Sequence, residues 1–62
     1  MYYWVIQEMR GRIFAIGPYK SSEAARNRMD KTSGGEVHLF RSLENDPQRA
    51  INDFKDERIK TL

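Results

Sequence analysis

Two neighbouring segments, residues 2–9 and 12–16, constrain the fold more than any other part of the chain. Both are rich in aromatic and β-branched side chains, and only Arg10-Gly11 separates them. Such segments favour β-strands, and a glycine in so short a connection supplies the positive φ that a tight hairpin needs. The sequence therefore predicts a β-hairpin whose second strand ends at Gly17-Pro18, because proline cannot donate a ladder hydrogen bond.

Pairing across this hairpin gives a sheet that is apolar on both faces. Glu8 is expected opposite Ile13, with the pairs Ile6–Ala15 and Trp4–Gly17 following from it. One face carries Tyr2, Trp4, Ile6, Glu8, Ile13 and Ala15, and the other carries Tyr3, Val5, Gln7, Met9, Phe14 and Ile16. A sheet with one face in water normally alternates apolar with polar residues. This hairpin does not, so both of its faces need cover or a partner.

Two helices and a third strand are expected in the remainder. Ser21 or Ser22 can cap a helix over roughly residues 22–31, which Gly34-Gly35 stops. Residues 36–43 alternate in part and are predicted to form a strand. Asp46-Pro47 is a helix start, with Asp as the cap and Pro at the first helical position, for a helix that extends to about Lys60.

These elements predict a single α+β domain over residues 1–62, with the order ββαβα. A helical crossover makes the third strand parallel to the second, so pairing it with the first gives a mainly antiparallel sheet of order 2-1-3. The simplest packing is a two-layer sandwich with both helices on one sheet face.

One sheet face is then left open. We expect Tyr3, Val5, Phe14 and Ile16 under the helices, joined by Val37 and Leu39, and Tyr2, Trp4, Ile6, Ile13 and Phe40 on the open face. The reverse assignment also exposes an apolar, aromatic patch, which on a small domain usually marks a partner site. The competing interpretation is that the C-terminal segment folds over the second face, with Phe54 or Leu62 covering it.

Composition narrows the function classes. The 62 residues include no cysteine and one histidine, His38, so disulfides, thiolate metal sites and a His-rich metal site are excluded and no metal or cofactor is expected. No nucleophile is placed beside His38, and no phosphate loop is present, so we do not expect an enzyme. We find no signal peptide and no membrane-spanning run, which makes the cytoplasm the expected compartment.

Residues 14–25, with the sequence FAIGPYKSSEAA, resemble the strand-to-helix segment of sporulation-related-repeat domains, which bind peptidoglycan. The resemblance covers 12 residues, and the chain lacks the helix that those domains place between their first two strands. Generic strand–turn–helix chemistry accounts for it, and glycan binding is not carried over.

The charge distribution favours a polyanionic partner. The formal net charge is +2, and residues 1–35 hold six Lys or Arg against three acidic residues, a net +3. Basic residues beside aromatic rings are what proteins use to bind single-stranded nucleic acid. We therefore expect a non-catalytic nucleic-acid-binding module, with candidate partner-binding residues Trp4, Ile6, Arg10, Arg12, Ile13 and Phe40. The alternative is a protein-interaction module, or a homodimer, that uses the same open sheet face.

Overall fold

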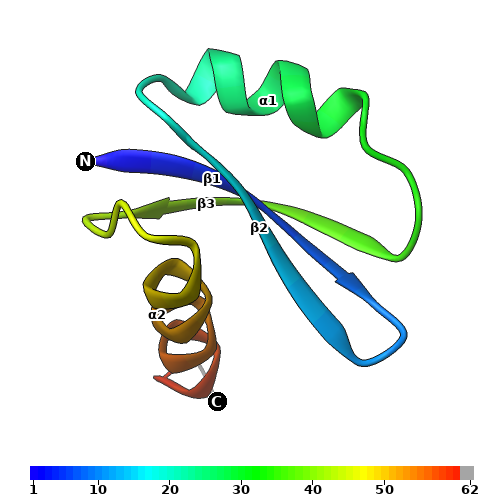
Figure 1. Cartoon of the computed structure of the whole chain (residues 1–62), viewed down its shortest axis with the longest axis vertical. Helices are drawn as coiled ribbons and strands as arrows, with labels where there is room; N and C mark the ends of the chain where they lie inside the picture. Colours follow the sequence, from blue (N-terminus) through cyan, green and yellow to red (C-terminus); the bar gives the residue numbers. More distant parts are fainter. Residues whose placement is uncertain (61–62) are drawn as a thin grey trace.

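The expected hairpin lies at the centre of the protein, in a computed structural model that describes residues 1–60. Its strands are β1 (Tyr2–Met9) and β2 (Arg12–Tyr19), and β3 (Glu36–Ser42) pairs antiparallel with the other side of β1. The sheet order is β2-β1-β3, as predicted, and the fold is α+β (Figure 1). Two helices complete it, α1 (Ser22–Asp30) and α2 (Pro47–Lys60).

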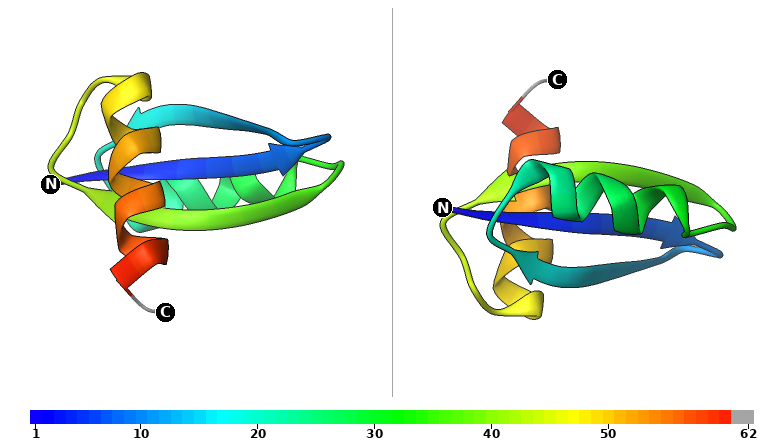
Figure 2. Two further views of the ribbon diagram at one scale, coloured as in Figure 1. Left: turned by 90° about the horizontal axis from the view of Figure 1, so that it is seen from below. Right: turned by 90° about the horizontal axis from the view of Figure 1, so that it is seen from above.

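The helices lie on opposite faces of the sheet, which corrects the expected two-layer arrangement. Figure 2 shows α2 in front of the sheet from one side and α1 in front of it from the other. Residues Ala50 and Phe54 of α2 pack against Trp4 and Ile6 of β1. The face that was expected to be open is therefore covered by the C-terminal helix, as in the competing interpretation, although Leu62 lies outside the described residues.

Central strand β1 explains this three-layer arrangement. Its consecutive residues Trp4, Val5 and Ile6 are all fully buried. Successive side chains of a strand point to opposite faces, so three buried neighbours require cover on both sides of the sheet. Burying apolar surface contributes about 25 cal/mol per Å², and Trp4 is the largest of these side chains. A helix on each face shields all three side chains from water.

Polar contacts hold the β3–α2 connection against this face. The Trp4 indole Nε1 donates to the carbonyl oxygen of Glu44 at 2.9 Å, so the buried ring keeps a hydrogen bond. Ser42, which is buried, donates its hydroxyl to Asp53 Oδ2 at 2.7 Å and accepts from the Glu44 amide at 3.0 Å. These bonds link the end of β3 to the connection and to α2, and they give the buried Ser42 hydroxyl both a donor and an acceptor partner.

The second strand does not end at Gly17-Pro18 but continues to Tyr19. Pairing follows the predicted register through Ile6–Ala15, then shifts so that Gly17 and Pro18 together lie opposite Trp4. This is a β-bulge, with two residues facing one. Proline is tolerated here because β2 is an edge strand.

Both predicted helix caps are present. The Ser21 hydroxyl accepts from the amide of Ala24 at 3.1 Å, which starts α1. Asp46 Oδ2 accepts from the amide of Arg49 at 3.2 Å, with Pro47 at the first position of α2.

Candidate functional site

A two-residue turn forms the tip of the hairpin. Met9 pairs with Arg12, so Arg10 and Gly11 alone make the connection, with φ values of 53° and 75°. Positive φ at both positions is characteristic of the type I′ turn, whose twist matches that of the flanking strands. The predicted positive φ at Gly11 is confirmed, and the turn projects Arg10 beyond the end of the sheet.

Four residues at this tip form an exposed surface, here called the tip patch: Met9, Arg10, Arg12 and Phe14. The register places Met9, Arg12 and Phe14 on the face that α1 covers elsewhere. Phe14 is nevertheless 41% exposed and Met9 36% exposed. The four side chains line an open groove of about 660 Å³.

The short first helix leaves the tip patch uncovered. Its nine residues include one fully buried side chain, Ala25. The chain leaves α1 through residues 31–35 and reaches the tip there, where Gln7 Nε2 donates to the carbonyl oxygens of Ser33 and Gly34, both at 3.0 Å. Gly34 lies directly against Met9, since a Cβ added there would be 3.1 Å from the Met9 sulfur.

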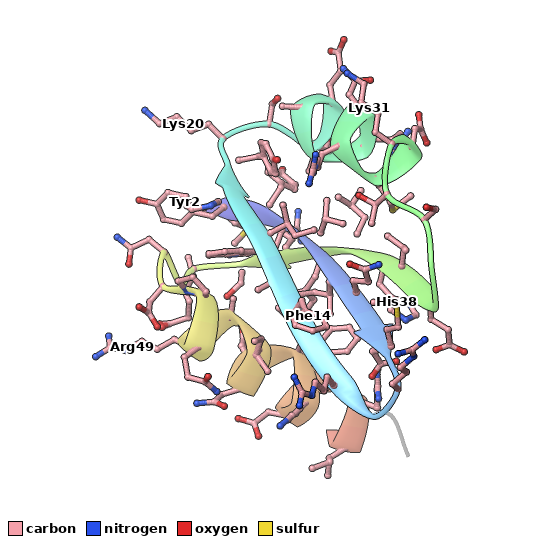
Figure 3. The ribbon with its side chains drawn as sticks, turned by 45° about the vertical axis from the view of Figure 1, so that its right-hand side comes forward. Tyr2, Phe14, Lys20, Lys31, His38 and Arg49 are labelled. Carbon is pink, nitrogen blue, oxygen red and sulfur yellow. The ribbon has the colours of Figure 1, made fainter. Side chains whose placement is uncertain are left out.

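Exposed basic residues continue from this connection onto α1. Arg28 is in its last turn and Lys31 follows it, while Lys20 precedes the helix at the other end (Figure 3). With Arg26 they give the segment from Lys20 to Lys31 four basic residues against the two acidic residues Glu23 and Asp30. The α1 side of the molecule therefore offers an aromatic ring at the tip and positive charge on both the hairpin and the helix.

The opposite side of the tip carries a second arrangement, here called the acid–imidazole cluster: Glu8, Glu36 and His38. Glu8 lies directly opposite Glu36 in the β1–β3 pairing. His38 Nε2 lies 3.6 Å from Glu8 Oε2 and 3.6 Å from Glu36 Oε2. Arg58 of α2 closes this side with an ion pair to Glu8 Oε1 at 2.5 Å.

Aromatic contacts hold the cluster against α2. The His38 and Phe54 rings lie 5.5 Å apart between centroids, and the Arg58 guanidinium lies 4.6 Å from the Phe54 centroid. A groove of about 460 Å³ runs from Glu8, Glu36 and Arg58 to the turn. The cluster is thus supported from the helix and open toward the hairpin tip.

The charges around Glu8 decide its ionisation. Burial acts to raise the pKa of this carboxyl, but the hydrogen bond and charge of Arg58 lower it, as does the charge of His38. The net result is a pKa of Glu8 below the usual glutamate value. Glu8 is therefore an ionised carboxylate at neutral pH.

The structure separates the six candidate residues predicted from the sequence. Arg10 and Arg12 are exposed at the tip, as a partner site requires. Trp4 and Ile6 have no exposed surface, because α2 covers them, and neither can contact a partner in this conformation. Ile13 and Phe40 are half-buried on the same face, with the Phe40 ring packed edge-on against Phe54 at 5.3 Å.

Sequence reasoning missed Phe14, which it placed under the helices. The signal was present in α1, whose apolar residues Ala24, Ala25 and Met29 are too few and too small to cover the full length of the hairpin. The acid–imidazole cluster was missed for another reason. Its members come from residues 8, 36 and 38, and only the β1–β3 register brings them together.

Comparison with known proteins found no family model, no curated protein and no solved structure that matches this chain. Within residues 1–60, neither helix has the length and apolar character needed to cross a membrane.

Proposed function

We propose that this chain is a small, non-catalytic module that binds single-stranded nucleic acid at the tip patch. The observation that carries the proposal is that the exposed Phe14 lines one open groove together with Arg10 and Arg12. An aromatic face stacks on any base, and arginine side chains pair with phosphates. The expected compartment stays the cytoplasm.

This proposal is narrower than the one drawn from the sequence. The aromatic sheet face that carries Trp4 is covered by α2, so stacking depends on the single ring of Phe14. The basic residues Arg28 and Lys31 at the end of α1 extend the positive surface beside it. One stacking ring with a few cations supports modest affinity and strong dependence on salt.

Fluorescence anisotropy of a labelled oligothymidylate tests the proposal through three variants. Phe14→Leu keeps an apolar side chain but removes the ring, and should weaken binding by about 1–3 kcal/mol. Arg12→Gln and Arg10→Asn each remove one cation, and Asn tolerates the positive φ of the turn. Each charge variant that loses a phosphate contact should reduce the slope of log K against log salt by about 0.7.

Arg49→Gln is the matched control, because Arg49 is an exposed arginine on α2, on the other face of the sheet from Phe14 (Figure 3). It should leave both affinity and salt slope unchanged. A loss with Arg49→Gln equal to that with Arg12→Gln would show general attraction to a basic protein. Together with full binding by Phe14→Leu, that result would refute a specific site at the tip.

Protein interaction remains a second candidate, supported by the neighbouring exposed apolar side chains of Met9 and Phe14. The sequence suggested a homodimer that pairs open sheet faces. That surface is not available, because α2 covers it. A dimer or a protein partner would instead use the tip patch. Association that persists at high salt, with a mass in solution that falls on Phe14→Ser substitution, would favour this candidate over nucleic acid.

A further inference from the structure

The acid–imidazole cluster holds a buried nitrogen whose hydrogen-bonding capacity is unmet. His38 Nε2 is buried and makes no hydrogen bond, although the side chain as a whole is 39% exposed. The two carboxylate oxygens nearest to it, at 3.6 Å, are beyond hydrogen-bonding distance. Buried polar atoms in native proteins nearly always have a partner, so this nitrogen requires an explanation.

The two carboxylates of the cluster are also unfavourably placed. Glu8 and Glu36 are directly opposed across neighbouring strands, an arrangement in which like charges are destabilising. Arg58 is paired with Oε1 of Glu8, which leaves Oε2 of Glu8 and Oε2 of Glu36 on the side of the imidazole. A cation between the three groups would offset the repulsion and give Nε2 a partner.

We propose that Glu8, Glu36 and His38 bind a divalent transition-metal ion, with Zn²⁺ as the reference ion. Zinc binds imidazole nitrogen and carboxylate oxygen at about 2.0–2.2 Å, so tetrahedral ligand atoms lie about 3.4 Å apart. The two nitrogen–oxygen separations here are 3.6 Å, and all three ligand atoms lie within 4.8 Å of one another. Small side-chain adjustments would bring them onto one ion.

The surroundings of the cluster fit such a site. Arg58 fixes the Glu8 carboxylate through its other oxygen, and Phe54 packs against the imidazole, so two ligands are oriented from α2. Glu8 and Glu36 line the groove of about 460 Å³, through which water or an anionic ligand can reach the cluster. One nitrogen with two oxygens favours zinc, cobalt or nickel over magnesium and calcium, which prefer oxygen alone.

This proposal goes beyond the sequence expectation of no metal, which rested on the absence of cysteine and on the single histidine. Its ligands are distinct from the proposed stacking ring, because the cluster lies on the α2 face of the sheet and Phe14 on the α1 face. Arg10 and Arg12 also line the groove beside the cluster, so the two sites are neighbours at the hairpin tip. The register supplies what the sequence could not show, namely that Glu8 of β1 joins Glu36 and His38 of β3.

Titration calorimetry of the untagged protein with ZnCl₂ tests the site, together with NMR of the His38 ring nitrogens. One Zn²⁺ should bind per chain, and the Nε2 resonance should move to the position of a metal-bound nitrogen. Glu36→Gln should weaken binding at least tenfold, and the Glu36 side chain is 74% exposed, so the fold should persist. His38→Gln should abolish the specific site.

Glu23→Gln is the control, since it removes an exposed carboxylate from α1 on the opposite face. It should bind Zn²⁺ as tightly as the unaltered chain. The proposal is overturned if the unaltered chain does not bind Zn²⁺, or if His38→Gln and Glu23→Gln bind equally well. It is also overturned if the NMR signal shows only a protonated imidazole paired with the carboxylates, with no response to metal.

Discussion

Among the four glycines, Gly35 has the least room for a side chain. Its φ is +66°, and a Cβ at this position would overlap the carbonyl oxygen of Glu8. The residue brings the start of β3 into backbone contact with the end of β1, next to the acid–imidazole cluster. A side chain there would have to move main chain rather than a flexible side chain.

Gly35→Ala should therefore destabilise the fold by more than Gly11→Ala, measured as the urea midpoint. Gly11 also has positive φ, at +75°, but a Cβ there meets nothing within 4 Å. Its substitution thus isolates the backbone cost, about 1–2 kcal/mol for an L-residue in the left-handed region. Equal midpoints for the two variants would show that the contact with Glu8 relaxes without cost.

The sequence revealed only half of the role of Gly35. Two consecutive glycines after a helical segment predict a stop, and α1 does end before them. The contact with Glu8 follows from the β1–β3 register, which joins residues far apart in the chain. Local patterns therefore identified the conformational requirement but not the steric one.

At the scale of elements, the start of α2 is set by Asp46. The carboxylate oxygen Oδ2 accepts from the Arg49 amide, and the Asp46 carbonyl accepts from the Ala50 amide at 2.9 Å. Asp46→Ala should cost about 0.5–2 kcal/mol, seen as a lower melting temperature. Asp46→Asn keeps a capping oxygen and should melt close to the unaltered chain; a fall as large as that of the alanine variant would contradict the capping role.

Strand and helix boundaries were largely predictable because their signals are local. Ser21, Asp46-Pro47 and the Arg10-Gly11 turn each act within a few residues, and all three have the expected role. The bulge at Gly17-Pro18 was not predicted, because proline was expected to end the strand, although the predicted order 2-1-3 already made β2 an edge strand where proline is tolerated.

At the scale of the whole molecule, the placement of α2 decides which surfaces are available. The apolar residues Ala50 and Phe54 could have faced either side of the sheet as far as the sequence shows. Trp4 settles the outcome in the fold, because its ring is buried against α2 while its Nε1 reaches the carbonyl of Glu44. For this reason Trp4 and Ile6 are buried and cannot contact a partner, whereas Arg10 and Arg12 of the predicted site are exposed.

The ion pair between Glu8 and Arg58 joins the first strand to the end of the last helix, so acid should loosen the whole molecule there. Because the pKa of Glu8 is lowered on folding, its ionised form stabilises the folded state above the unfolded value of about 4.3, and this contribution is lost as pH falls through the lower folded pKa. Glu36 and His38 from β3 and Arg58 from α2 all face this carboxylate. The urea midpoint, measured with chelator present, should therefore fall between about pH 5 and pH 3.

Glu8→Gln should lower the midpoint at neutral pH and flatten this fall, whereas Glu23→Gln on α1 should preserve it. If the midpoint of Glu8→Gln falls with acid as steeply as that of the unaltered chain, this ion pair does not contribute to holding α2 against the sheet.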